Sequence, residues 1–157
     1  MIVRKAIPED RDAITAILND VIKIGGTTAY ETPKEPTFFD RFIQPEDDRT
    51  FIHVAVSDGE VVGFQWMNPD DTGMGLIATF AQAGTTKRGI GSALFKYTLK
   101  CCRDAGYTVL DATIRADNTG GLAYYSKMGF EDHSVTKGQP LKDGTPVDRV
   151  HKRMMLE

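Results

Sequence analysis

Residues 118–130 read NTGGLAYYSKMGF, and the spacing within this stretch decides the fold. The stretch is expected to form a short helix followed by a strand, and its marked positions are Asn118, Gly121, Tyr125 and Gly129-Phe130. Tyr125 lies on the expected helix beside a second tyrosine, and half-buried packing is the common fate of helical aromatics. On these residues alone, Tyr125 is either a packing residue or part of a functional site.

A glycine-rich segment, GTTKRGIG at residues 84–91, joins an expected strand to an expected helix. Amide groups at the start of a helix form an anion site together with the helix dipole, and glycine lets a phosphate approach the backbone. Lys87 and Arg88 add positive charge there. A P-loop is excluded because Ile90-Gly91 stands where Lys-Ser/Thr is required, and a dinucleotide fingerprint is excluded because Leu94 replaces its third glycine. Glycines that only turn a tight corner remain the alternative.

Helical and strand-like patterns alternate along the rest of the chain. Apolar residues at helical spacing predict a helix over residues 9–24 that Gly25-Gly26 ends. Asp58-Gly59 predicts a hairpin turn between two strand-like runs. The expected strands are residues 2–6, 51–56, 61–67, 76–82, 108–114, 130–135 and 149–156, and the other expected helices are 38–43 (capped by Thr37), 91–105 and 120–127. Together they predict an α/β fold with an α+β mixed sheet in one domain over residues 1–157.

Composition excludes several classes of function. The chain has 157 residues, 41% of them hydrophobic and 26% charged, with a formal net charge of −3. This mildly acidic balance argues against nucleic-acid binding, which needs clustered Lys and Arg. The adjacent Cys101 and Cys102 offer neither a disulfide framework nor zinc spacing, and the histidines lie on separate expected strands, so no metal is assigned. Without a signal peptide or a membrane-length apolar run, we expect a cytoplasmic protein with no membrane partner.

The two segments together resemble the GNAT superfamily of acyl-CoA-dependent N-acyltransferases. The hallmarks of that superfamily are a Q/R-x-x-G-x-G/A loop and, after the next strand, an N-x-x-A-x-x-x-Y-x-x-x-G-F helix segment. Both occur here in the right order, although Thr86 replaces Gln/Arg and Gly121 replaces a small Ala or Ser. The resemblance implies a mostly antiparallel sheet with a splayed acyl-CoA-binding strand pair, flanked by about four helices. It also implies acetyl-CoA as co-substrate.

The resemblance assigns roles to individual residues. It implies that Asn118 hydrogen-bonds the pantetheine arm of coenzyme A and that Tyr125 is the general acid that protonates the departing thiolate. Backbone groups of Thr79, Phe80 and Ala81 would pair with the same arm. The pyrophosphate would be cradled by Lys87, Arg88, Gly89, Ile90, Gly91 and Ser92.

No dedicated general base is evident. The attacking amine must be neutral, so acyl transfer to nitrogen needs a proton acceptor. Relatives carry a Glu at the position of Thr113 or at that of Leu76. Asp111, Glu31 or an ordered water chain remain as candidates.

A looser similarity concerns the acceptor. The loop at residues 27–36, with Lys142-x-Gly144 and Asp148, resembles phosphinothricin-type acetyltransferases, although Val147 stands where that subgroup has a histidine. Tyr30 and Glu31 are therefore candidate substrate contacts, with an ordinary polar loop as the alternative. We expect an N-acetyltransferase for a small amino-acid-like amine. The alternatives are a protein or peptide amine as acceptor, or a non-catalytic acyl-CoA-binding module, and a homodimer is left open.

Overall fold

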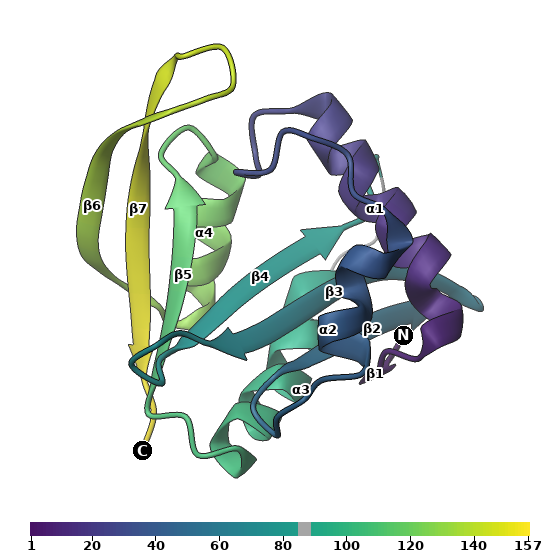
Figure 1. Ribbon diagram of the computed structural model, residues 1–157. Coiled ribbons are helices and arrows are strands. Elements are labelled where there is room, and N and C mark those ends of the chain that lie inside the picture. Colours follow the sequence, from purple (N-terminus) through teal and green to yellow (C-terminus); the bar gives the residue numbers. More distant parts are fainter. Residues whose placement is uncertain (85–88) are drawn as a thin grey trace.

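The computed structural model describes residues 1–84 and 89–157 and contains one seven-stranded sheet (Figure 1). The strands are β1 (Ile2–Lys5), β2 (Phe51–Ser57), β3 (Glu60–Pro69), β4 (Gly75–Ala81), β5 (Val109–Arg115), β6 (Glu131–Pro140) and β7 (Pro146–Met155). The α-helices are α1 (Arg11–Ile24), α2 (Asp40–Ile43), α3 (Ile90–Asp104) and α4 (Thr119–Met128), and two short 3-10 helices are η1 (Pro8–Asp10) and η2 (Pro36–Phe39). The predicted mixed α/β sheet is confirmed.

The strand order is β1-β2-β3-β4-β5-β7-β6, and every neighbouring pair is antiparallel except β4 and β5. The predicted hairpin joins β2 to β3, and its turn places Asp58 and Gly59 at φ values of 52° and 80°. The Asp-Gly turn signal works because both central residues of this turn type need positive φ. The crossover from β4 through α3 to β5 supplies the one parallel pair.

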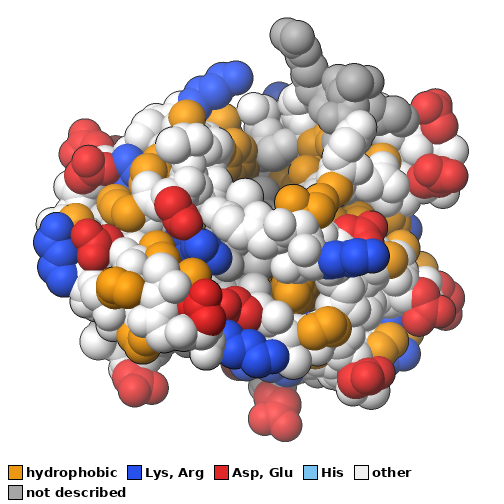
Figure 2. Space-filling model, turned by 90° about the horizontal axis from the view of Figure 1, so that it is seen from above, with side chains coloured by type: hydrophobic (Ala, Val, Ile, Leu, Met, Phe, Trp, Pro, Cys, Tyr) orange, Lys and Arg blue, Asp and Glu red, His pale blue; other side chains and the backbone are white. Residues whose placement is uncertain are grey.

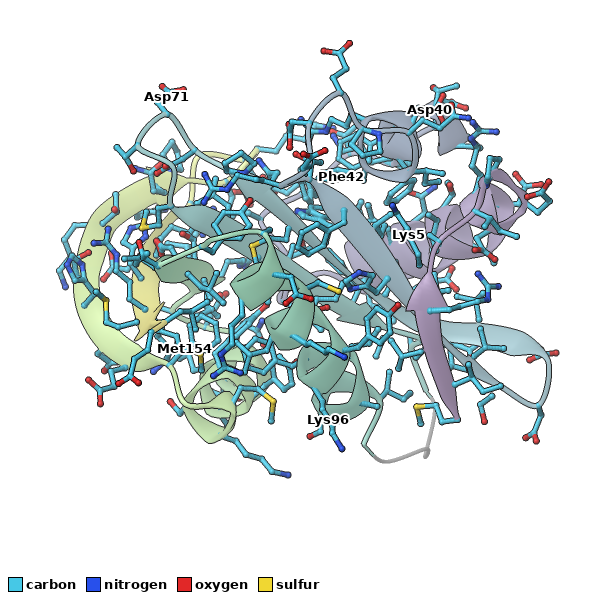
Figure 3. All side chains as sticks on the ribbon, turned by 90° about the horizontal axis from the view of Figure 1, so that it is seen from below. Lys5, Asp40, Phe42, Asp71, Lys96 and Met154 are labelled. Atoms are coloured by element: carbon cyan, nitrogen blue, oxygen red, sulfur yellow. The ribbon has the colours of Figure 1, made fainter. Side chains whose placement is uncertain are left out.

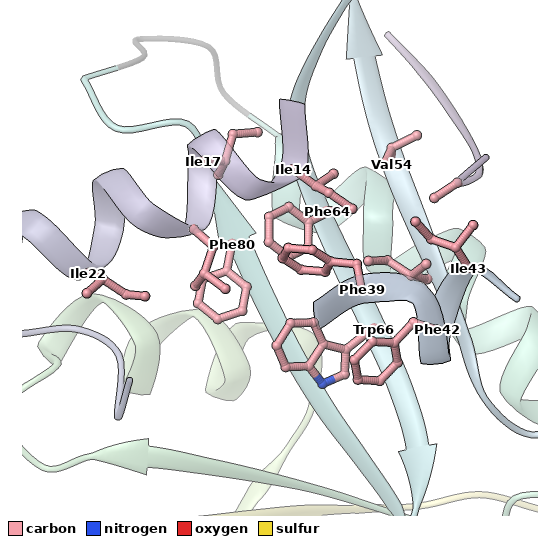
Figure 4. Close-up of a cluster of buried hydrophobic side chains, with 13 residues drawn as sticks. Ile14, Ile17, Ile22, Phe39, Phe42, Ile43, Val54, Phe64, Trp66 and Phe80 are labelled. Atoms are coloured by element: carbon pink, nitrogen blue, oxygen red, sulfur yellow. The ribbon is translucent and has the colours of Figure 1, made fainter. Parts of the chain in front are cut away.

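One face of the sheet carries an aromatic core under α1 and α2 (Figure 4). The Trp66 ring of β3 stacks on Phe42 of α2, with centroids 4.7 Å apart. Phe80 of β4 packs beside Trp66 at 5.4 Å. Since side chains alternate along a strand, Trp66 and Phe80 define the sheet face that α1 and α2 cover.

The opposite face packs against α3 and α4, which lie in front of the sheet when the molecule is seen from below (Figure 3). Phe95 of α3 and Tyr125 of α4 meet Phe130 in this second cluster. On the strands, Ile77, Leu110 and Ala112 point to the same side. The sheet therefore has a large core on each face, and a smaller third cluster joins the start of α3 to β2 and β3 through Ala55, Val62, Ile90 and Leu94.

Two details differ from the sequence-based expectations. Thr37 does not cap the helix at residues 38–43, because the segment begins two residues earlier as η2, at Pro36. Its N-cap is Glu35, which forms no side-chain hydrogen bond. Both strands of the last hairpin extend further toward its tip than the patterns over residues 130–135 and 149–156 predict. Residues 131–140 are almost all exposed, so the strand has no buried face to produce an alternating pattern.

Candidate active site

The parallel strands β4 and β5 diverge, which opens the middle of the sheet (Figure 1). They pair only at Gly75–Leu110 and Leu76–Asp111. Beyond these pairs, Thr79, Phe80 and Ala81 keep their β3 partners but have no partner on β5. The result is a V-shaped opening with its apex at the Leu76–Asp111 pair.

A cavity of about 720 Å³ occupies this opening. The surface is visibly hollowed when the molecule is seen from above, and charges of both signs surround the hollow (Figure 2). Its walls come from β3, β4, β5, α4, the start of α3 and the loop after α1. The volume falls within the usual range for small-molecule sites, roughly 300–1,000 Å³.

The start of α3 lies at the wide mouth of the V. Gly89 has a φ of 81°, a left-handed conformation that favours glycine, and its carbonyl accepts the first intrahelical bond from the Ala93 amide at 2.9 Å. The amides of Ile90, Gly91 and Ser92 precede that bond and have no helical acceptor. Such a group of amides at a helix N-terminus favours an anion.

Gly91 is held against α4 and lines the cavity. The Tyr124 hydroxyl donates to the Gly91 carbonyl at 2.7 Å, and a Cβ added at Gly91 would lie 2.5 Å from Tyr124 Cε1. The tyrosine therefore fixes the first turn of α3 to α4. The predicted phosphate contacts Lys87 and Arg88 lie outside the described residues.

Asn118 is the N-cap of α4. Its Oδ1 accepts from the Gly121 amide at 2.9 Å, and its Nδ2 donates to the Thr27 carbonyl at 3.0 Å. A Cβ at Gly121 would lie 2.4 Å from that Nδ2, so a larger residue there would require the Asn118 side chain to shift. Asn118 lines the cavity, where the resemblance implies that it contacts the pantetheine arm. Its side chain also connects α4 to the loop after α1.

Tyr125 lies on the cavity wall formed by α4 and is only 7% exposed. Its hydroxyl is 2.8 Å from Thr79 Oγ1, which also accepts from Gln65 Nε2 at 2.8 Å. Burial raises the pKa of the Tyr125 phenol, and the Thr79 hydrogen bond only partly offsets this. The phenol is therefore fully protonated at neutral pH and is equipped to donate a proton.

The other side of the V opens toward α1 and α2. In the sheet register Trp66 is paired with Ala78, and Leu76 is paired with both Asn68 and Asp111. Directly paired side chains share a face, so Asp111 and Asn68 lie on the same side as Trp66. Thr79 and Tyr125 belong to the opposite side.

Aromatic and cationic groups surround this second half. The Tyr30 ring lies 6.3 Å from Trp66 and forms part of the wall. Arg41 also lines the cavity, with its guanidinium 4.6 Å from the centroid of Phe42. Over the described parts of the chain, Arg41 has no carboxylate within ion-pair distance.

The loop after α1 covers this half, and three contacts fix it. The buried Arg115, paired with Asp117 at 2.7 Å, donates to the Thr28 carbonyl at 3.2 Å. Asn118 holds Thr27, as described above. Glu31 accepts from the Lys142 amide at 2.8 Å, which ties the loop to the tip of the β6–β7 hairpin.

The structure thus gathers most of the predicted site residues around one cavity, whose lining includes Tyr30, Thr79, Phe80, Ala81, Gly91, Asn118 and Tyr125. Gly89, Ile90 and Ser92 lie next to it at the start of α3. Glu31 is outside the lining and contacts the hairpin instead. Sequence reasoning missed Arg41 and Asn68, and the only available signal for Arg41 was its position beside aromatic residues in a short helix.

In residues 1–84 and 89–157, no group of three or more His, Cys, Asp or Glu side chains is arranged to hold a metal ion. Within the same residues, no helix is long and apolar enough to cross a membrane.

Comparison with known proteins defines the family. Residues 16–130 match the acetyltransferase (GNAT) family, and the chain belongs to that family, whose members use acetyl-CoA. The chain is similar to a mycothiol acetyltransferase from Clavibacter sepedonicus, 32% identical over 57% of this chain and 29% of the relative, so the match spans less than a third of that protein.

Two solved structures share the fold. A ribosomal-protein-alanine N-acetyltransferase from Brucella melitensis superposes with a TM-score of 0.90 at 23% identity, covering 99% of this chain and 100% of the other. A phosphinothricin acetyltransferase from Sinorhizobium meliloti, in complex with acetyl-CoA, gives a TM-score of 0.87 at 21% identity, covering 99% and 88%. The predicted family and fold class are confirmed.

Proposed function

We propose that residues 1–157 form one acetyltransferase domain that transfers an acetyl group from acetyl-CoA to the primary amine of a small amino-acid-like molecule. The observation that carries this proposal is a continuous cavity that passes through the V between β4 and β5. One side of it holds a buried phenol, and the other side holds aromatic walls and the Arg41 guanidinium, which has no carboxylate partner among the described residues. A donor and an acceptor entering from opposite sides meet at the strands.

The residues of the first side fit coenzyme A. The free amides of Ile90, Gly91 and Ser92 suit its pyrophosphate, and the unpaired edge of β4 offers backbone groups to an amide-containing arm. When bound, acetyl-CoA supplies an activated acyl group as a thioester. An arm held at α3 that followed β4 past Thr79 would bring its reactive end toward the apex of the V.

Tyr125 acts on that end. Its hydroxyl is held by Thr79 Oγ1, and its raised pKa keeps the proton on oxygen at neutral pH. A developing thiolate is stabilised by such a hydrogen-bond donor and can take its proton as the C–S bond breaks. Tyr125 therefore donates the proton that the departing sulfur needs.

The second side selects the amine. Tyr30 and Trp66 provide apolar contact area, and Arg41 provides a fixed positive charge without a carboxylate of its own among the described residues. A guanidinium binds a carboxylate through two parallel hydrogen bonds. The loop at residues 27–31 closes the space above, which favours a small acceptor over a folded protein surface.

The test is a panel of amines in matched pairs, assayed by release of free thiol from acetyl-CoA. Leucine and phenylalanine are compared with 3-methylbutylamine and 2-phenylethylamine, which lack only the carboxylate. We expect kcat/KM to be about tenfold or more higher for the amino acids, since a charge-assisted contact is worth roughly 1.5–3 kcal/mol. Arg41→Met should remove that preference and leave the carboxylate-free amines unaffected.

Peptides with free N-termini and lysine side chains form the contrasting arm of the panel. Faster turnover of peptides than of every small amine would contradict the proposed acceptor class. Acetyl-CoA binding in calorimetry without turnover of any amine would instead indicate a non-catalytic acyl-CoA-binding module.

A further inference from the structure

A buried carboxylate lies at the apex of the V on the amine side. Asp111 of β5 lines the cavity, and its side chain is only 5% exposed. It is paired with Leu76 in the last register pair before β4 and β5 separate. The carboxylate therefore lies close to the point at which an arm that followed β4 from α3 would end.

Asp111 has no hydrogen-bond donor of its own in the described parts of the chain. Its Oδ1 is buried without a partner. On β7, His151 Nδ1 and Arg153 Nε approach Oδ2 at 3.9 and 4.0 Å, which is too long for hydrogen bonds. A buried acceptor without a donor costs free energy, so an incoming N–H group at this place is strongly favoured.

Most of the charged groups that act on Asp111 are basic, and the Arg153 Nε, 4.0 Å away, is also buried without a hydrogen-bond partner. His151 and Arg153 face Asp111 from β7, His133 acts on it from β6, and Asp70 acts from the turn between β3 and β4. Burial raises the pKa of the Asp111 carboxyl, and the three basic groups only partly offset this. The carboxylate is therefore more basic than an exposed aspartate, which improves it as a proton acceptor.

We propose that Asp111 binds the ammonium group of the acceptor and takes its proton, which makes it the general base of the reaction. This rests on the proposed amine acetylation. The carboxylate accepts one proton from R–NH3⁺, and the N–H bond pair becomes the lone pair of R–NH2. The neutral nitrogen would then form the C–N bond while the C–S bond breaks; the sulfur takes the Tyr125 proton, and the second proton that the nitrogen loses restores the Tyr125 phenol. The proton passes from the Asp111 carboxyl to water after product leaves.

The position of Asp111 on the strand supports this role. Thr113, two residues further along β5, lies on the same face and also lines the cavity. Asn68, across Leu76 in the same row, adds an uncharged polar group. Asp111 is the only carboxylate in the lining formed by the described residues.

The experiment compares wild type, Asp111→Asn and Asp10→Asn with the best amine of the panel. Asp10 is a matched control because its side chain is also buried, at 7% exposed, but lies at the start of α1 outside the cavity. For Asp111→Asn we expect kcat/KM at pH 7 to fall by about 10²–10⁴-fold. The loss should shrink about tenfold per pH unit up to the pKa of the amine, because the variant has to bind the free amine. Wild type and Asp10→Asn should not show this slope.

A binding measurement gives a readout that does not depend on turnover. With coenzyme A present in place of acetyl-CoA, calorimetry should show that Asp111→Asn weakens the amine at pH 7 by about tenfold or more. The double variant Asp111→Asn/Thr113→Glu returns a carboxylate to the same face and should recover part of the activity and the flat pH profile. If Asp111→Asn does not fold, Asp111→Glu tests the same point by retaining the flat profile.

The outcomes separate the two proposals. If wild type acetylates no amine, the proposed function is wrong. If wild type acetylates amines while Asp111→Asn keeps its pH profile and its amine affinity, the general-base role is wrong and the proposed function stands. A loss in Asp111→Asn that is equal at every pH also contradicts the role, because a structural defect has no reason to follow the ionisation of the amine.

Discussion

Replacing Tyr125 with Phe separates packing from catalysis at one atom. The ring stays in contact with Phe130, whose centroid lies 5.2 Å away, so the volume of the core does not change. The lost hydroxyl breaks one hydrogen bond, and Thr79 Oγ1 keeps its second partner, Gln65. One such bond contributes about 0.5–1.5 kcal/mol, so we expect Tm to fall by about 1–6 °C.

The catalytic effect should be much larger than the structural one. General acid catalysis contributes about 10²–10⁴-fold, and a thiol with a reference pKa near 8.5 is already a fair leaving group, so we expect kcat to fall by about 10²-fold. The affinity for acetyl-CoA should change little. Because burial raises the pKa of this phenol, wild-type activity should show no loss from Tyr125 ionisation between pH 6 and about pH 10.

Tyr107→Phe is the matched control for this prediction. Tyr107 is 3% exposed, and its hydroxyl donates to the Arg49 carbonyl outside the cavity. It should lose a similar amount of stability and keep the wild-type kcat. The assay is steady-state turnover with the best amine, together with thermal unfolding and calorimetric binding of acetyl-CoA. An unchanged kcat in Tyr125→Phe, or an equal loss in both variants, would refute the assignment of Tyr125 as the general acid.

Two further predictions concern stability. Gly91→Ala places a Cβ 2.5 Å from Tyr124 Cε1 and should cost about 1–3 kcal/mol in urea unfolding; a Tyr124→Leu background should relieve part of that cost, and strictly additive costs would contradict the packing argument. Burial tends to raise the pKa of Asp10, but hydrogen bonds and the charge of Arg4 outweigh burial and lower this pKa. The ion pair therefore stabilises the fold above about pH 3.9, and this stabilisation is lost as the pH falls through the lower pKa of the folded state. Arg4→Met should therefore cost about 0.2–1 kcal/mol at pH 7, discounted because Arg4 is 40% exposed, and this cost should shrink as pH falls below about 3.9; a cost that is the same at every pH would count against the ion pair.

The sequence was sufficient for those features that depend on local patterns. The helix over residues 9–24 carries its apolar residues at helical spacing, and the hairpin has an Asp-Gly turn, so both follow from neighbouring residues. The expected segment at residues 120–127 lies within α4 because the Asn118-to-Gly129 spacing is itself helical. Each of these signals is contained within a few turns of chain.

The amine side of the cavity depends on contacts that no local pattern encodes. Arg41 reaches the cavity because α2 packs on Trp66, a contact across the aromatic core. Glu31 was a reasonable candidate from its loop, but the β6–β7 hairpin takes its carboxylate, and the extent of that hairpin could not be predicted from exposed residues. Asn118 gained a structural role for the same reason, since the Thr27 carbonyl is 91 residues away in the chain.

The proposed general base, Asp111, shows most clearly the difference between what the sequence predicts and what the strand pairing adds. A comparison with relatives examines the two positions at which those relatives carry a Glu. In this chain these positions are Leu76 and Thr113, and neither has a carboxylate. The register places Asp111 directly beside Leu76 across the last β4–β5 pair, and it is two residues from Thr113 on the same face of β5. What the chemistry requires is an acceptor oxygen at the apex of the V, not a Glu at a given position in the chain. Asp111 was already a candidate from the sequence, where it stands two residues before Thr113. The pairing of two strands separated by α3 adds that Asp111 also lies beside Leu76, and this favours it over the other candidates for the proposed role.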